Sequence, residues 1–113
     1  MSASQTEYLT AYRALDRLFK ETGVDEFAIL LGAMDIDRGD NRPMDPRMWE
    51  YWEEASKDAS GVDVLLNFLS IYAGHLTPPP LEFDALLGQL KNRSSSAYKL
   101  LVGYWQDARS TAP

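Results

Sequence analysis

Apolar residues recur along most of the chain with the three- and four-residue spacing of an α-helix, and no alternating strand pattern longer than four residues competes with it. The first such pattern follows Ser4 and Glu7, whose spacing forms a capping box, and Gly23 marks its end. Its apolar face comprises Tyr8, Tyr12, Leu15, Leu18 and Phe19. We therefore predict a first amphipathic helix that buries this face.

The next segment, residues 27–34 (FAILLGAM), is apolar on every side. This composition predicts a short, nearly buried helix, with Asp25 as its N-cap. A short continuous apolar run also fits a buried strand, so a strand over residues 27–31 is the alternative.

The third helix is predicted from its start signals. Asp45 is a favourable N-cap, and Pro46 suits the first helical position. Over residues 47–59 the helical spacing puts one set of residues on a common face: Met48, Tyr51, Trp52 and Ala55. The acidic side chains lie mostly on other faces, and Glu53 is placed to pair with Lys57 one turn later.

Three more helices follow from the same periodicity. In residues 62–76, polar or small residues at positions 63, 67, 70 and 74 form a narrow stripe on an otherwise apolar rod, which predicts the central core helix. Pro80 can open a fifth helix, with a face made of Phe83, Leu86, Leu87 and Leu90. Residues 91–95 interrupt the pattern, and a sixth helix then presents Tyr98, Leu101, Val102 and Trp105.

Together these patterns predict an all-α fold, a compact single-domain bundle of five to six short helices over residues 1–113, frayed at about 1–5 and 110–113. A length of 113 residues with 45 % hydrophobic residues suits one globular domain. The longest apolar region, residues 62–76, is too short and too polar to span a bilayer, and the first residues show no secretion signal. Without cysteines the chain has no disulfide or thiolate chemistry, so we expect a cytoplasmic protein.

The net charge is −6, and the acidic residues are concentrated in the middle of the chain. Residues 35–64 contain nine acidic and four basic side chains, whereas residues 65–113 contain three and four. Phosphate backbones repel an acidic surface, so we expect no nucleic-acid partner. Attraction to a basic protein partner is compatible with this charge distribution.

Residues 35–46 (DIDRGDNRPMDP) hold acids, a glycine and two prolines between two apolar segments. A calcium-binding loop of the EF-hand type needs acids at its first, third and fifth positions, Gly at the sixth and Glu at the twelfth. Counted from Asp35, the fifth position is Gly39 and the twelfth is Pro46, so the pattern fails. Residues 38–40 spell Arg-Gly-Asp, which is too short to be specific. We interpret the segment as a polar turn and expect no metal or other cofactor, with weak cation binding by residues 35–45 as the alternative.

The sequence lacks recognisable catalytic motifs, with no Gly-x-Ser-x-Gly, phosphate-binding loop or two-histidine metal motif. His75, the sole histidine, has no oriented partner among its neighbours and suits the C-terminus of a helix. Glu53 and Glu54 are adjacent on a helix and diverge, so they cannot share a proton as a catalytic pair. The sequence therefore favours a protein that is not an enzyme.

Aromatic residues lie among the acids of the third helix. Trp52 is expected in the core, whereas Trp49, flanked by Glu50 and Glu53, would add an aromatic anchor to an acidic surface if it lies at the rim. The candidate partner-binding residues are Asp35, Asp37, Asp40, Trp49, Glu50, Glu53 and Glu54.

Residues 30–55, about a quarter of the chain, resemble a pattern found in small bacterial all-helical proteins: Leu-Leu-Gly, a short loop, then Asp-Pro-x-x-Trp-x-x-Trp and an acidic helix. The matching residues are Leu30, Leu31, Gly32, Asp45, Pro46, Trp49 and Trp52. Some of these proteins are immunity proteins of contact-dependent growth inhibition systems. The resemblance implies an inhibitor whose partner is a toxin, and many such toxins are basic nucleases.

We therefore expect a non-catalytic protein-binding module, with an immunity- or antitoxin-type inhibitor of a basic protein as its specific form. The alternative is a self-associating accessory or regulatory subunit, such as a homodimer, in which apolar helix faces pair with a second chain. A small metal-binding protein that uses residues 35–45 is a third hypothesis.

Overall fold

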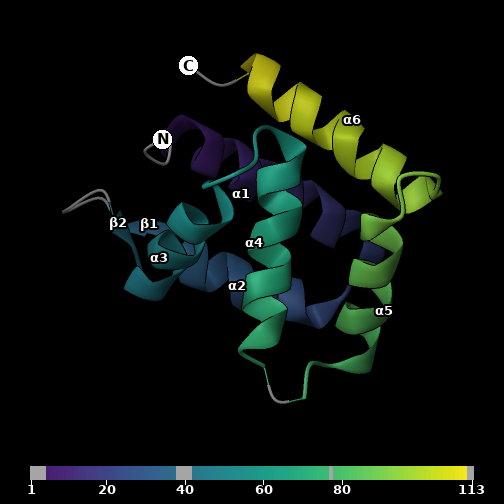
Figure 1. Cartoon of the computed structure of the whole chain (residues 1–113), viewed down its shortest axis with the longest axis horizontal. Coiled ribbons are helices and arrows are strands. Elements are labelled where there is room, and N and C mark those ends of the chain that lie inside the picture. The colour runs from purple at the N-terminus through teal and green to yellow at the C-terminus, as the bar shows by residue number, and fades with distance from the viewer. Residues whose placement is uncertain (1–4, 38–41, 77, 112–113) are drawn as a thin grey trace.

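In the computed structural model the described residues, 5–37, 42–76 and 78–111, contain six α-helices. These are α1 (Gln5–Thr22), α2 (Asp25–Met34), α3 (Pro46–Ala55), α4 (Val62–Gly74), α5 (Leu81–Lys91) and α6 (Ser96–Thr111). Helix α4 runs through the middle of the bundle with the other helices around it, and α6 packs chiefly along α1 (Figure 1). The predicted all-α single domain with a central fourth helix is confirmed. None of these helices is long and apolar enough to cross a membrane.

Two two-residue strands, β1 (Ile36–Asp37) and β2 (Arg42–Pro43), form an antiparallel pair between α2 and α3. Ile36 pairs with Pro43, and the Met44 amide donates to the Asp35 carbonyl at 2.7 Å, which extends the pairing by one step. The segment predicted as a plain turn is therefore closed at its base by a short ladder. Its tip, residues 38–41 with the Arg-Gly-Asp sequence, lies outside the described residues.

The core is organised around aromatic rings from three helices. The Trp52 ring lies edge-on to Tyr8 of α1, with centroids 5.6 Å apart, and to Phe68 of α4, also at 5.6 Å. The Tyr8 hydroxyl donates to the carbonyl oxygen of Met34 at 2.9 Å, which ties α1 to the end of α2. Burial of Tyr8 raises the pKa of its phenol, so this hydroxyl stays a donor. These contacts join four helices through side chains that the sequence placed on apolar faces.

Helix α2 is less buried than the nearly buried helix that was predicted from its apolar composition. Its buried apolar residues are Phe27, Leu30, Leu31 and Met34. Ile29, on the other face, is 63 % exposed, because no other described element covers that side. The predicted cap is also wrong: Val24 occupies the N-cap position without a side-chain hydrogen bond, and Asp25 lies in the first turn. Residues 27–31 are helical, so the alternative of a strand is wrong.

A buried polar pair links α2 to the central helix. The Tyr72 hydroxyl donates to a carboxylate oxygen of Glu26 at 2.5 Å, and both side chains are largely buried. Burial, followed by the hydrogen bond to Glu26, raises the pKa of Tyr72, so its proton remains in the pair. A buried carboxylate needs such a partner, and this contact lets Glu26 point into the core.

The first and last helices reach into the segments where fraying is predicted. Helix α1 begins at Gln5 and α6 continues to Thr111. Pro80 is the N-cap of α5 rather than its first residue. Ser4, the predicted cap of the first helix, lies outside the described residues.

The start of α3 matches its prediction. A carboxylate oxygen of Asp45 accepts a hydrogen bond from the Arg47 amide at 3.0 Å, with Pro46 at the first helical position. The Arg47 guanidinium also donates to this carboxylate, at 2.8 Å for its closest nitrogen. These side-chain hydrogen bonds, followed by the backbone one, lower the pKa of Asp45.

We expect Asp45→Ala to lower the free energy of unfolding by about 1 kcal/mol at pH 7, because the first turn of α3 loses its cap. Asp45→Asn, which keeps an acceptor, should retain most of this stability. The folded-state pKa lies below the ordinary value, so the difference from Asp45→Ala should shrink as pH falls below about 4 and through the folded pKa. Urea unfolding at pH 7 and pH 3 measures both effects. An Asp45→Ala difference that stays the same at pH 3 would contradict this account.

Candidate functional site

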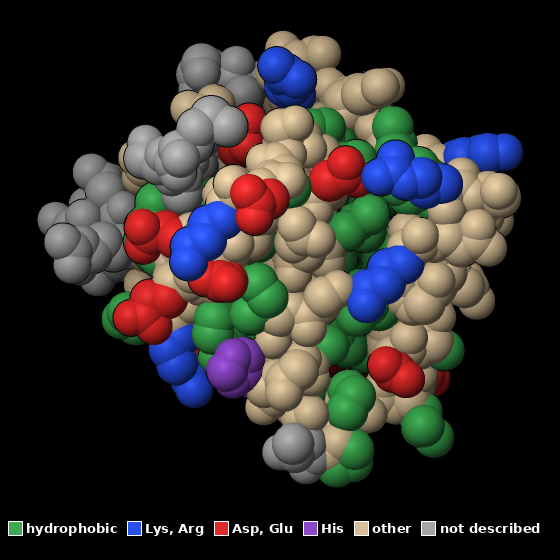
Figure 2. Space-filling view, viewed as in Figure 1, with side chains coloured by type: hydrophobic (Ala, Val, Ile, Leu, Met, Phe, Trp, Pro, Cys, Tyr) green, Lys and Arg blue, Asp and Glu red, His purple; other side chains and the backbone are tan. Residues whose placement is uncertain are grey.

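The outward face of α3 presents acidic side chains in a row. The Asp45–Pro46 start sets the helix register, and burial of Met48, Trp52 and Ala55 turns the opposite face to solvent. Four exposed carboxylates occupy that face and the turn after it, and we call them the acidic stripe: Glu50, Glu53, Glu54 and Asp58. Acidic side chains gather over α3 and its connection to α4, whereas basic ones lie largely toward α5 and α6 (Figure 2). One short helix therefore concentrates negative charge on one side of the molecule.

Lys57 lies within the acidic stripe. Its ammonium is 2.8 Å from a carboxylate oxygen of Glu54, so the predicted pairing with Glu53 is wrong, and the pair spans three residues instead of four. The hydrogen bond and charge of Glu54, with smaller contributions from Asp58 and Glu53, raise the pKa of Lys57. In the described part of the chain, Lys57 is the one base at ion-pair distance from the stripe. Four acids therefore share one base, and the stripe keeps a negative field.

Aromatic side chains border the acidic stripe on both sides. Because an α-helix turns about 100° per residue, Trp49 and Tyr51 lie on either side of Glu50, and both are half-buried. The Trp49 ring packs against Tyr8 at 5.5 Å, and the Tyr51 ring stacks on His75 at 4.7 Å with an interplanar angle of 15°. Each ring is therefore held by a neighbour while part of it reaches solvent. Trp52, which follows Tyr51 in the sequence, is fully buried as predicted.

The other predicted site residues lie in the segment between α2 and α3. Asp35 is exposed, and its carboxylate accepts a hydrogen bond from the Ile36 amide at 2.9 Å. Its charge adds to the effect of burial in raising the pKa of Tyr12. The backbone of Asp37 belongs to β1, while its side chain and all of Asp40 lie outside the described part of the structure. The structure thus brings Trp49, Glu50, Glu53 and Glu54 together on one helix. Of the three aspartates, Asp35 is the one whose side chain is described, and it lies before β1 and not on α3.

The titratable side chains near this surface are exposed or packed on a single neighbour. Within residues 5–37, 42–76 and 78–111, no group of three or more acidic or histidine side chains is placed to hold a metal ion. His75 lies at the C-terminal end of α4, where it stacks on Tyr51. Glu53 and Glu54 are both exposed to solvent. None of these groups has the buried, oriented partner that a general acid or base requires.

Two features of this surface were missed from the sequence. Asp58 extends the stripe, and the spacing of positions 50, 53, 54 and 58 was the signal that could have found it. The stack of Tyr51 on His75 joins residues 24 positions apart and has no local sequence signal.

Comparison with known protein families, with curated proteins and with solved structures found no match. The resemblance of residues 30–55 to immunity proteins stays a prediction.

Proposed function

We propose that this chain is a non-catalytic protein-binding module whose acidic stripe, with Trp49 and Tyr51 at its borders, binds a basic protein. The observation that carries the proposal is the set of four exposed carboxylates on one face of α3 and its following turn, with Lys57 as their one ion-paired base among the described residues. Carboxylates grouped in this way attract a positive surface over several ångströms before contact.

The charge pattern favours fast association. Oppositely charged surfaces steer encounters and raise the association rate by about 10- to 1000-fold over uncharged pairs, and added salt removes this gain. The chain's net charge of −6 acts in the same direction as the stripe. Exposed charges contribute little once they are paired in water, so the stripe acts mainly on rate and choice of partner.

The bordering aromatics supply the contact that charge alone does not. Trp and Tyr are enriched among the residues that dominate binding energy, and both rings here are already ordered, by Tyr8 and by His75. A side chain that is packed before binding loses less conformational entropy on binding. Trp49 and Tyr51 therefore act as the apolar anchors of the interface.

The specific form we propose is an immunity-type inhibitor. A protein that acts on nucleic acid carries a positive surface for phosphates, and an acidic stripe bordered by aromatic rings is complementary to such a surface. Occupying that surface blocks substrate without any catalysis by the inhibitor. The resemblance of residues 30–55 to immunity proteins supports this choice of partner.

The test compares two charge reversals of equal size. Glu50→Lys with Glu53→Lys reverses the stripe, and Glu21→Lys with Glu82→Lys makes the same change at exposed positions on α1 and α5. Each variant and the unmodified chain is used to capture proteins from a lysate of the source organism at low and high salt. We expect a basic protein that the unmodified chain and the control retain at low salt and the stripe variant loses.

Kinetics with the captured protein then give the size of the effect. Reversing the stripe should slow association at least about ten-fold at low salt and flatten its salt dependence, while the control changes it only slightly. Equal capture and equal rates for both variants would contradict the proposal. A chain that captures no partner and sediments as a concentration-dependent dimer would favour the self-associating alternative.

A further inference from the structure

The end of α3 holds a cation that the chain supplies itself. The Lys57 ammonium lies 2.8 Å from a carboxylate oxygen of Glu54. Its hydrogen bond to Glu54, together with the charge of that group, raises the pKa of Lys57. Two further carboxylates, those of Asp58 and Glu53, add to this rise in pKa. Three acids of the stripe therefore act on one ammonium, and this position already binds a positive group.

The backbone after α3 brings these groups together. Helix α3 ends at Ala55, but the Ser56 amide still donates to the Trp52 carbonyl at 3.0 Å. The Lys57 amide donates to the Glu54 carbonyl at 3.4 Å, so the chain continues to turn beyond the helix. The last carbonyl groups of a helix carry a partial negative charge, which also favours a cation at this end.

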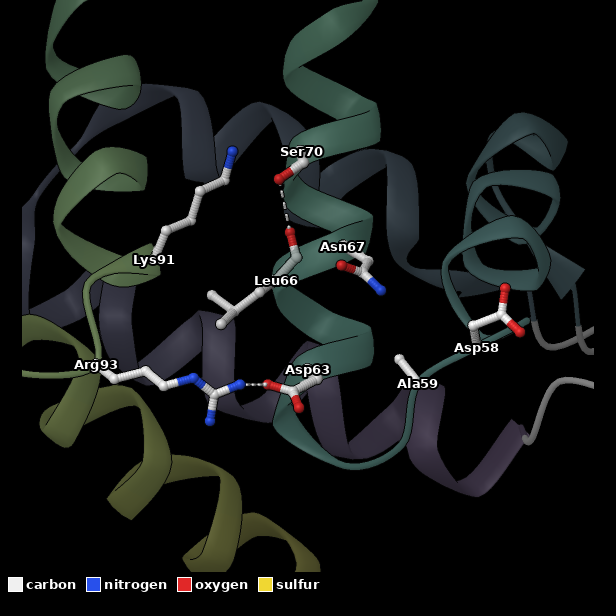
Figure 3. Close-up of a pocket in the computed structure, with 8 residues that line it drawn as sticks. All are labelled: Asp58, Ala59, Asp63, Leu66, Asn67, Ser70, Lys91 and Arg93. Atoms are coloured by element: carbon white, nitrogen blue, oxygen red, sulfur yellow. Dashed lines mark hydrogen bonds and ion pairs between the residues drawn. The ribbon is translucent and has the colours of Figure 1, made fainter.

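Asp58 belongs to this group of acids and not to the interior of the bundle. Figure 3 shows its carboxylate turned away from the hollow beside α4, which Lys91 and Arg93 line on the opposite side. Asp63, the next acid along the chain, accepts a hydrogen bond from the Arg93 guanidinium at 3.0 Å (Figure 3). The negative field at the end of α3 therefore comes from the stripe, since Asp63 is already paired.

The ion pair of Lys57 with Glu54 is open to water. The Lys57 side chain is 66 % exposed and that of Glu54 is 60 % exposed. Exposed pairs of this kind contribute little to stability, because water and salt screen their attraction. Within the described residues, Glu53 and Asp58 form no ion pair of their own. A positive group from outside can therefore replace the Lys57 ammonium at small cost.

We propose that the Lys57 ammonium occupies the position of a basic side chain of the partner, which displaces it on binding. The displacement depends on the binding of a basic protein proposed above, and it makes Lys57 an internal competitor of that protein. Lys57 weakens the interaction because it holds Glu54 and because its charge repels an incoming base. The displacing side chain is still attracted, since three carboxylates surround the position of one ammonium.

Lys57→Gln tests the displacement with a defined basic probe, a fluorescently labelled octalysine peptide. Binding to the full chain is measured by fluorescence anisotropy at about 100 mM salt, where charges are screened over about 10 Å. We expect Lys57→Gln to bind the peptide about two- to five-fold more tightly than the unmodified chain, because the competing ammonium is gone.

Lys20→Gln is the matched control, because Lys20 forms an exposed ion pair of the same kind, 2.9 Å from Asp16. Both substitutions make the same change in net charge. At the 1.5 Å rise of a helix, Lys20 lies about 18 Å along α1 from Tyr8, the residue whose ring contacts Trp49. That distance exceeds the screening length, so Lys20→Gln should change the affinity by less than about 1.5-fold. Equal gains for the two variants would overturn the displacement.

Glu54→Gln separates displacement from simple repulsion. If Lys57 acts by holding Glu54, the gain from Lys57→Gln should be largely lost when Glu54→Gln is already present. A gain of the same size in both backgrounds would show that Lys57 only repels the probe, and would overturn the displacement.

The stripe reversal, Glu50→Lys with Glu53→Lys, distinguishes failure of the displacement from failure of the proposed function. We expect this variant to lose most of its affinity for octalysine. Unchanged affinity would contradict the proposed function itself, because the stripe would then not attract a basic partner. A loss of affinity here, without a gain in Lys57→Gln, would contradict the displacement alone.

Discussion

We expect Trp52→Ala to lower the free energy of unfolding by about 3–5 kcal/mol, the largest effect of any substitution considered for this chain. Trp52 is fully buried, and its ring contacts Tyr8 and Phe68 edge-on, so it joins α3 to both α1 and α4. Alanine would remove these contacts and leave a cavity where three helices meet. Urea unfolding followed by circular dichroism measures the loss without depending on tryptophan fluorescence.

Trp49→Ala is the matched control, because it makes the same chemical change three residues away. The Trp49 ring is half-buried and has Tyr8 as its ring partner, so its loss should cost about half as much. If Trp52→Ala lowers the free energy of unfolding no more than Trp49→Ala does, Trp52 is not the central packing residue described above.

The indole nitrogen of Trp52 leads to a different expectation for Trp52→Phe than for Trp52→Ala. It is buried and has no hydrogen-bond partner among the described residues. An unpaired buried donor costs about 1–3 kcal/mol, and Trp52→Phe removes that donor while keeping an aromatic ring. We therefore expect Trp52→Phe to lower the free energy of unfolding by less than half the loss seen for Trp52→Ala.

The second large effect concerns the backbone before the central helix. Gly61 has φ +61° and ψ −140°, a conformation that is almost restricted to glycine. A Cβ atom at this position would meet no other atom within 4 Å, so any cost of Gly61→Ala comes from the backbone alone. We expect Gly61→Ala to lower the free energy of unfolding by about 1–3 kcal/mol, measured by urea unfolding.

Gly32→Ala should change the free energy of unfolding in the opposite direction when it is measured in the same way. Gly32 lies inside α2 on its exposed side, and a Cβ atom there would also meet nothing within 4 Å. Alanine favours a helix over glycine by about 0.5–1 kcal/mol, so this variant should be more stable than the unmodified chain. Equal effects of the two substitutions would show that the conformation of Gly61 is not what determines the result.

The candidate binding surface could be predicted from the sequence because it lies on one helix. Helical spacing alone relates Glu50, Glu53 and Glu54, and the apolar residues on the opposite side of the helix indicate that these acids face solvent. The aspartates at 35, 37 and 40 belong to another segment, and no local rule places them relative to α3. A hollow beside α4 could not be predicted for the same reason, because its lining residues come from separate segments between residues 58 and 93.

The sequence by itself determined a bundle of five to six helices, the approximate position of each helix, the apolar face of each amphipathic helix and the side of α3 that carries the acids. Those properties depend on neighbours within one or two turns, where backbone geometry is fixed. Only the tertiary structure decided which apolar sides are covered: Ile29 is exposed although α2 is apolar all round, and Glu26 is buried because Tyr72 reaches it. Burial depends on which distant element packs against a side chain, and helical periodicity reflects only contacts between residues that are close in the sequence.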